Sequence, residues 1–228
     1  MAVASSSSSS ALAIWEPPAA ATPMHLPERT YELPATGAVV ISQRWGAAGT
    51  GAAQWHVGAL LAALVDREGP EKWRGLRVLE TGAGGGGLAA VAALRAGATY
   101  LATDRDANVF GMFEENVRRN VADVARYRGT RRLAWGDAVD GAVAQLGGAP
   151  DVVLAADVIF PGTRDAWPAF FDCLKALRAP RTLLAYTVRY AKDDRLFFRG
   201  LARAGLRATA LEADGVSSTI YEVSRVDS

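Results

Sequence analysis

The chain has 228 residues, half of them hydrophobic, which is enough for one well-filled α/β domain and short for two. Its 25 lysine and arginine residues are nearly balanced by 24 acidic ones, and the formal charge of +1 gives no support to a nucleic-acid partner. One cysteine and two histidines argue against a disulfide framework and against a Cys/His metal site. Because no apolar run reaches the roughly 18 residues of a membrane span, we expect a cytoplasmic protein without a membrane partner. Nothing in the sequence indicates an oligomer, so we expect a monomer.

The first 28 residues are rich in serine and alanine and are predicted to form a low-complexity, disordered tail. The tail has no acidic residue before Glu16, which is also typical of organelle-targeting segments. It contains no arginine and no basic stretch ahead of an apolar one, so targeting is the less favoured interpretation. Residues 29–228 are then predicted to form a single domain.

The predicted elements begin with a short β-hairpin over residues 31–45, around the turn Pro-Ala-Thr-Gly. A helix follows, because Val57, Leu61 and Leu64 recur on one face with Leu60 and Val65. Strand patterns and helix patterns then alternate. The strands are expected at 77–81, 99–104, 131–135, 151–157 and 182–188, and the helices at 88–97, 107–120, 139–146, 164–177 and 193–204.

Two more strands, 206–213 and 218–226, close the chain with little between them, so they should form an antiparallel hairpin at one end of the sheet. The alternation predicts an α/β fold of the Rossmann-like type: a seven-stranded, mostly parallel sheet with helices on both faces. Ligands of such sheets bind beyond the carboxyl ends of the strands, where the strand order reverses. Four residues fall at such ends: Glu80, Asp104, Trp135 and Asp157.

The stretch LETGAGGGGLAA (79–90) offers a ligand almost nothing but backbone. A Walker-type phosphate loop is excluded, since Leu88 stands where the lysine is needed. A dinucleotide loop fits better, because Gly82, Gly84 and Gly87 satisfy G-x-G-x-x-G and Asp104 follows 22 positions after Gly82. The turn could also serve packing alone, since glycine allows positive φ and close helix–sheet contact.

S-adenosyl-L-methionine is the third candidate ligand for this loop. It has the same ribose as a dinucleotide, but it carries an ammonium, a carboxylate and a sulfonium in place of a pyrophosphate. Glu80, two residues before Gly82, would repel phosphates and attract an ammonium. The charge of this residue therefore favours S-adenosyl-L-methionine.

The segments LETGAGGGGLAA, ATDRD, LAWGD and LAADVIF, together with Gln54-Trp55, resemble the seven-strand methyltransferases of family 16. Many members of that family are protein-lysine methyltransferases, and the resemblance covers about residues 36 to 223. It implies an S-adenosylmethionine-dependent enzyme with a protein substrate, such as a translation factor or a chaperone. By the same resemblance, the cofactor pocket is lined by Trp55, Gly82, Ala83, Gly84, Asp104, Trp135 and Ala156.

The residues fit the roles that the resemblance implies. Asp104 can accept hydrogen bonds from both ribose hydroxyls. Trp135 can offer its ring to adenine, while its backbone and Asp137 take the polar edge of the base. Asp157 and Phe160 match the family's Asp-x-x-aromatic signature, at the mouth where substrate meets the methyl group. Asp157 would align a lysine amine and Phe160 would wall the lysine channel.

The chain also departs from the family pattern, because Thr81 precedes the glycines and Gly85 replaces the usual threonine. The lost hydroxyl is expected to weaken cofactor binding. Further along, Thr187 and Arg189 resemble the end of the fifth sheet strand in members that act on elongation factors. Arg189 is nevertheless expected to be a solvated charge, and Cys173 a packed helix residue.

Other functions stay open at this point. The same fold supports methyltransferases that act on small molecules or on protein histidine. RNA and DNA amine methylases often carry Asn/Asp-Pro-Pro-aromatic where this chain has DVIF, which argues against them. A non-catalytic cofactor-binding module and a dinucleotide-dependent oxidoreductase are the remaining alternatives.

Overall fold

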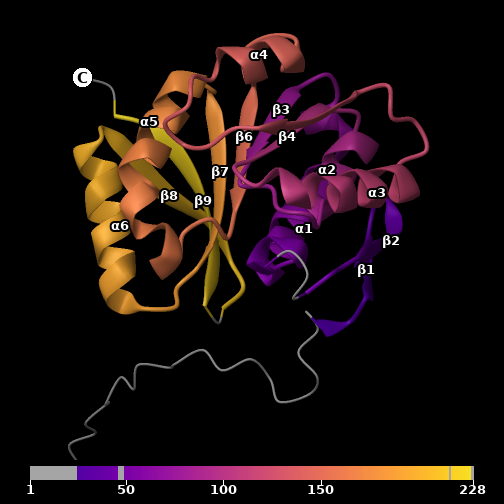
Figure 1. Cartoon of the computed structure of the whole chain (residues 1–228), viewed down its shortest axis with the longest axis horizontal. Coiled ribbons are helices and arrows are strands. Elements are labelled where there is room, and N and C mark those ends of the chain that lie inside the picture. The colour runs from indigo at the N-terminus through magenta and orange to yellow at the C-terminus, as the bar shows by residue number, and fades with distance from the viewer. Residues whose placement is uncertain (1–24, 46–48, 216, 227–228) are drawn as a thin grey trace, which may run out of the picture.

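The computed structural model of the chain describes residues 25–45, 49–215 and 217–226 (Figure 1). The predicted tail lies outside the described residues as far as residue 24. The first element is an antiparallel hairpin of β1 (Glu28–Leu33) and β2 (Gly37–Ser42), which begins three residues earlier than the sequence suggested. The expected turn separates the two strands, and Gly37 has a φ of +87° that favours glycine.

The main sheet has seven strands in the order β5-β4-β3-β6-β7-β9-β8, as the sequence predicted in number and character. All strands are parallel except β9, which runs antiparallel to both of its neighbours. The first strand of this sheet, β3, is central. The next two, β4 and β5, extend the sheet on one side, and β6 pairs with β3 on its other side. The strands are β3 (Arg77–Thr81), β4 (Thr99–Asp104), β5 (Tyr127–Arg132), β6 (Val152–Ala156), β7 (Arg181–Thr187), β8 (Leu206–Ala213) and β9 (Ser218–Arg225).

Three helices and the small hairpin cover one face of the sheet, and three helices cover the other (Figure 1). Alternate residues of each strand point to opposite faces of the sheet. Val78 packs on the face covered by the hairpin and its three helices, Leu79 packs on the other face, and both are fully buried. The first layer contains α1 (His56–Trp73), α2 (Leu88–Arg95) and α3 (Phe110–Asn120). The second contains α4 (Asp140–Leu146), α5 (Trp167–Leu177) and α6 (Ala191–Arg203).

Two of the predicted boundaries that were wrong concern the surroundings of the site. The strand expected at 131–135 is β5, which begins already at Tyr127 and ends at Arg132, the residue paired with Asp104 at the end of β4. Trp135 therefore lies three residues beyond the strand, in a turn closed by hydrogen bonds between Ala134 and Asp137. The helix expected from 164 begins as a 3₁₀ segment, Pro161–Ala166, and becomes α-helical only at Trp167.

Cys173 is buried in α5, as expected, and burial raises the pKa of its thiol to about 11. It is therefore a packing residue, which stays protonated at neutral pH. In the described part of the chain no helix combines the length and the apolar character needed to cross a membrane.

Candidate active site

The turn from β3 into α2 is built from glycines whose conformations and surroundings exclude other residues. Gly82 and Gly84 have φ values of +68° and +60°, a region that disfavours residues with a Cβ. A Cβ on Gly84 would lie 2.9 Å from the carbonyl oxygen of Gly51, and one on Gly82 would lie 2.5 Å from Val158. The turn thus combines strained backbone with close approach of neighbouring segments.

The segment before α1 lies directly on this turn. Its 3₁₀ helix, Gly49–Ala52, accepts a hydrogen bond of 2.8 Å from the Gly85 amide at the carbonyl of Gly51. Gln54 is buried, and its side-chain oxygen accepts a hydrogen bond of 3.2 Å from the amide of Leu88, the first residue of α2. A side chain on Gly86 would collide with that oxygen, since its Cβ would lie only 2.3 Å away.

Asn116 of α3 holds the turn from the other side. Its side-chain nitrogen donates to the carbonyls of Gly85 and Gly86, at 3.0 Å each, and it is fully buried. The same side chain exchanges hydrogen bonds with the backbone of Ser42 in β2. One amide therefore links the small hairpin to the glycine turn. This role could not be predicted from the sequence, because a buried amide within a helix follows no sequence pattern.

The structure accounts for both departures from the family's glycine loop. A Cβ on Gly85 would lie 2.1 Å from the Cε of Met112, so the methionine occupies the space that a threonine side chain would need. Thr81 is fully buried, and its hydroxyl accepts a hydrogen bond of 2.8 Å from the indole nitrogen of Trp135. Thr81 thus orients the tryptophan across the turn.

Asp104 ends β4 with both carboxylate oxygens facing backbone donors. One oxygen accepts from the Gly84 amide and the other from the Asp106 amide, each at 2.9 Å. Each oxygen keeps a second lone pair for a ligand hydroxyl. The carboxylate is therefore held in place next to the glycine turn.

Glu80, at the end of β3, is a buried acid whose burial raises its pKa to about 7, although the Tyr100 hydroxyl donates to it at 2.6 Å. The nearby charge of Asp104 raises the pKa further. A buried carboxyl of this kind gains from a cationic partner. It is thus prepared for a ligand that brings positive charge.

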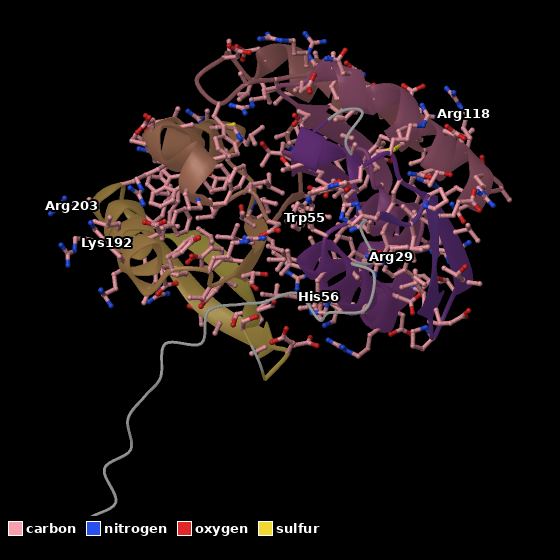
Figure 2. All side chains as sticks on the ribbon, turned by 60° about the horizontal axis from the view of Figure 1, so that its bottom comes forward. Arg29, Trp55, His56, Arg118, Lys192 and Arg203 are labelled. Carbon is pink, nitrogen blue, oxygen red and sulfur yellow. The ribbon has the colours of Figure 1, made fainter. Side chains whose placement is uncertain are left out.

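A cavity of about 470 Å³ opens at the carboxyl ends of β3, β4 and β6. Ten of its lining residues are those singled out in the sequence, so the structure brings all of them together. They are Trp55, Glu80, Gly82, Ala83, Gly84, Asp104, Trp135, Ala156, Asp157 and Phe160. In Figure 2, Trp55 lies toward the centre of the view, whereas Lys192 and Arg203 project outward from α6.

Asp157, in the wall of this cavity, forms an ion pair with Arg189. The two guanidinium nitrogens donate to the two carboxylate oxygens at 2.7 and 2.5 Å. The Arg189 side chain is only 21 % exposed, and its guanidinium carbon lies 5.6 Å from the centre of the Trp55 ring. The prediction of a solvated Arg189 was wrong, because the acid and the tryptophan that bury it come from distant parts of the sequence.

The expected role of Asp137 at the edge of an adenine base is not supported. Asp137 is not among the residues of the cavity wall; it accepts from the Ala134 amide and lies 3.6 Å from Arg132. Thr187 is also directed elsewhere, since it is buried and hydrogen-bonded to Ser218 of β9. Trp135 itself lines the cavity, with its ring 4.8 Å from that of Phe170.

The wall of the cavity has a chemistry that suits a cationic nucleoside. Glu80, Asp104, Asp106 and Asp157 contribute carboxylates, and Arg105 is the basic residue among the described lining residues. Glycines of the turn line the cavity and carry no side chains, so a ligand can closely approach their backbone. A pyrophosphate would face the carboxyl of Glu80 in this cavity without a lysine to balance it.

Comparison with known proteins gives a consistent result. Residues 35–204 match the family described as lysine methyltransferase. Protein N-lysine methyltransferase METTL21A of Danio rerio is 31 % identical over 159 residues, which cover 68 % of this chain and 69 % of the relative. Human protein-lysine N-methyltransferase EEF2KMT is 32 % identical over 201 residues, 78 % of this chain and 59 % of the relative, so the match spans less than two thirds of that protein.

Among solved structures, a SAM-dependent methyltransferase from Agrobacterium tumefaciens superposes with a TM-score of 0.57. The two chains are 17 % identical, and the match covers 88 % of this chain and 71 % of the other. At this identity the likeness concerns the fold alone, and it agrees with the Rossmann-like sheet seen here.

Proposed function

The chain belongs to the lysine methyltransferase family of S-adenosylmethionine-dependent enzymes, and we propose that it transfers a methyl group to the ε-amine of a lysine in a protein. The observation that carries the proposal is the cavity at the carboxyl ends of the strands, in which the ten residues meet. The acidic residues in its wall would repel the pyrophosphate of a dinucleotide, which supports S-adenosyl-L-methionine as the ligand. Translation factors and chaperones are the first substrate classes to test.

The cavity wall fits the cofactor part by part. Asp104 would accept hydrogen bonds from the ribose, and Glu80 would face the ammonium of the methionine moiety, where its buried carboxyl gains a positive partner. The bare turn from Gly82 to Gly84 would let the ligand approach the backbone. Trp55 and Trp135 would flank the adenosine. When bound, the cofactor supplies a methyl carbon already activated by a sulfonium.

The remaining work of the protein is to position the acceptor and to exclude water. A lysine amine has a pKa of about 10.4 in water, so it must lose a proton before it can attack. Asp157 and Phe160 line the same cavity, beyond Ala156 at the end of β6. We assign to Asp157 the alignment of the amine and to Phe160 the wall of the channel, with water as the proton acceptor.

Ligand-induced stabilisation tests the choice of cofactor. S-adenosylhomocysteine should raise the melting temperature, by the equivalent of about 2.7 kcal/mol at one hundred times its dissociation constant. NAD(H) should have no effect. Asp104→Ala should abolish the shift, whereas Asp157→Asn should retain it and lose methyl transfer. Stabilisation by NAD(H) alone would contradict the proposal.

Transfer itself is tested with tritiated S-adenosylmethionine and a lysate of cells that lack this enzyme. We expect one or a few labelled protein bands, with mass spectrometry locating the label on lysine. Label on histidine, or only in the small-molecule fraction, would favour the corresponding alternative. Asp157→Asn serves as the control for contaminating methyltransferases, because it should bind cofactor without labelling the band.

A further inference from the structure

Arg189 lies in the loop between β7 and α6 and pairs with Asp157, which lines the cavity. Its side chain is held on two sides, by the bidentate hydrogen bonds to Asp157 and by the ring of Trp55 at 5.6 Å. The three residues come from separate elements: the end of β6, the loop after β7 and the residue before α1. A planar guanidinium suits this arrangement, because it can pair with a carboxylate through two nitrogens and still lie near an aromatic ring.

The ion pair is shielded from water, and Arg189 keeps its positive charge. The side chain of Asp157 is 4 % exposed, and that of Arg189 is 21 % exposed. Burial opposes the charge of Arg189, but the hydrogen bonds and the attraction of Asp157 outweigh it and raise its pKa. At this degree of burial, the positive charge of Arg189 acts on its neighbours with little screening.

The backbone of Asp157 indicates that the direction of its carboxylate matters. Asp157 has a φ of +56°, a left-handed conformation that is unfavourable for a residue other than glycine. Its amide donates to the carbonyl of Ala185 in β7 at 2.9 Å, while Arg189 holds the carboxylate. Backbone and side chain are thus fixed separately.

We propose that Arg189 is a positioning residue that cancels the charge of Asp157, so that the acceptor lysine binds as a free amine. An unpaired carboxylate at this place would stabilise the ammonium form and raise the pKa of the lysine, which opposes reaction. With Arg189 in place, the carboxylate can still accept a hydrogen bond through its remaining lone pairs without favouring the ammonium. The inference rests on the proposed function.

The proposed step balances without a further reactant. The lysine ammonium releases a proton to water on entering the site. The nitrogen lone pair then forms the new N–C bond, while the S–C bond breaks and its electron pair stays on sulfur. The positive charge passes from sulfur to nitrogen, and the methylated ammonium loses its excess proton to solvent.

Other charged or titratable groups lie in the cavity wall or on the neighbouring elements, and none of them is altered in the variants below. They are Glu80 of β3, Asp104, Arg105 and Asp106 at the end of β4, His56 of α1, Arg164 before α5, Tyr186 of β7, Tyr190 beside Arg189, and Asp193 and Asp194 of α6. Burial raises the pKa of Glu80 to about 7, and this residue is unchanged in all the proteins compared. A difference between variants therefore reports on Arg189.

The test compares Arg189→Gln and Arg189→Lys with the wild-type enzyme, and uses Lys192→Gln as the matched control. Lys192 is exposed at the start of α6, three residues from Arg189. The rate of tritium transfer to the principal labelled lysate protein is measured from pH 6 to pH 9.5 with saturating cofactor. Calorimetry with S-adenosylhomocysteine should give the same affinity for all four proteins, which verifies their fold and cofactor site.

We expect Arg189→Gln to move the acidic limb of the profile upward by about one pH unit, which is about a tenfold slower rate on that limb. The rates should converge with wild type at high pH. Arg189→Lys and Lys192→Gln should keep the wild-type midpoint, because the first preserves the charge and the second lies outside the site.

Three results would overturn the inference alone: an equal loss by Arg189→Gln at every pH, the same shift in Arg189→Lys, or a loss of S-adenosylhomocysteine affinity in Arg189→Gln. The first would mean that Arg189 only supports the loop, the second that its charge is not what matters, and the third that it belongs to the cofactor site. Absence of lysine labelling by the wild-type enzyme would instead overturn the proposed function, and this inference with it.

Discussion

Gly85 and Met112 form a matched pair, in which the small residue of the turn makes room for the large one of α3. A Cβ at position 85 would lie 2.1 Å from the Met112 Cε and 3.3 Å from the Val109 carbonyl oxygen. The departure from the family loop is thus coupled to a side chain 27 positions away. Where the family's threonine would place its hydroxyl, this protein has the packed side chain of Met112.

We therefore expect Gly85→Thr alone to destabilise the protein by roughly 1–3 kcal/mol, through overpacking of a closed site. Adding Met112→Ala should recover part of that loss, because it frees the volume that the threonine needs. Chemical denaturation of the four proteins in the double-mutant cycle measures the coupling. Additive effects would show that Met112 moves aside at no cost.

The limits of the sequence are clearest at individual positions. Glu80, Asp104 and the glycines could be selected because their chemistry and their place at strand ends point to a ligand. The burial of Arg189 could not be predicted, because it depends on Asp157 and Trp55, which contact Arg189 only in the folded chain. The same holds for Asn116, whose partners are carbonyl groups of the turn and the hairpin.

Helix α3 supports the glycine turn through Asn116 and the hairpin through Asn120. Asn120 exchanges hydrogen bonds with Val40 of β2, much as Asn116 does with Ser42, but it does not contact the turn. The two residues therefore separate support of the hairpin from support of the cofactor site.

We expect Asn116→Ala and Asn120→Ala each to cost roughly 1–3 kcal/mol of stability, because buried backbone groups lose their partners. Only Asn116→Ala should also weaken S-adenosylhomocysteine binding, since it alone releases the carbonyls of Gly85 and Gly86. Denaturation and calorimetry on both variants provide the comparison. An equal loss of affinity in Asn120→Ala would mean that the hairpin as a whole shapes the site.

The elements were predictable where hydrophobic periodicity is strong, as in α1 and the buried strands. The exception is β5, an edge strand with mostly polar residues, whose end is set by the last pair with β4, between Arg132 and Asp104. Such pairing depends on the tertiary structure and cannot be predicted from the residues of β5 alone. Because β5 ends at Arg132, Trp135 lies in the turn that follows, but it lines the cavity as expected.

The stability of the whole molecule should depend on pH through Glu80. Its pKa is about 7 in the folded protein against an ordinary value of 4.5, so the folded state binds a proton that the unfolded state has released. This contribution to stability is fully present below about pH 4.5 and is lost as the pH rises through 7. In the folded protein, Glu80 thus favours its neutral form.

Glu80→Gln should remove this dependence, because the amide stays neutral at every pH. Between pH 5 and pH 7.5, the unfolding free energy of the variant should increase relative to that of the wild type by about a few kcal/mol in total. Urea denaturation without ligand, repeated across that range, measures the difference. Glu115→Gln, at an exposed acid of α3, is the control and should run parallel to wild type. Parallel curves for Glu80→Gln would contradict the assignment.

The two indole rings in the cavity wall have an optical consequence. Trp55 and Trp135 both line the place where adenosine is proposed to bind. Of the other described tryptophans, Trp73 and Trp167 are buried elsewhere in the fold, and Trp45 is exposed with its ring 6.1 Å from that of Trp55. Arrival of a nucleoside should therefore quench part of the intrinsic emission, and replacing either ring by phenylalanine would divide the signal between them. The enzyme would then report its own occupancy by fluorescence, with no label attached.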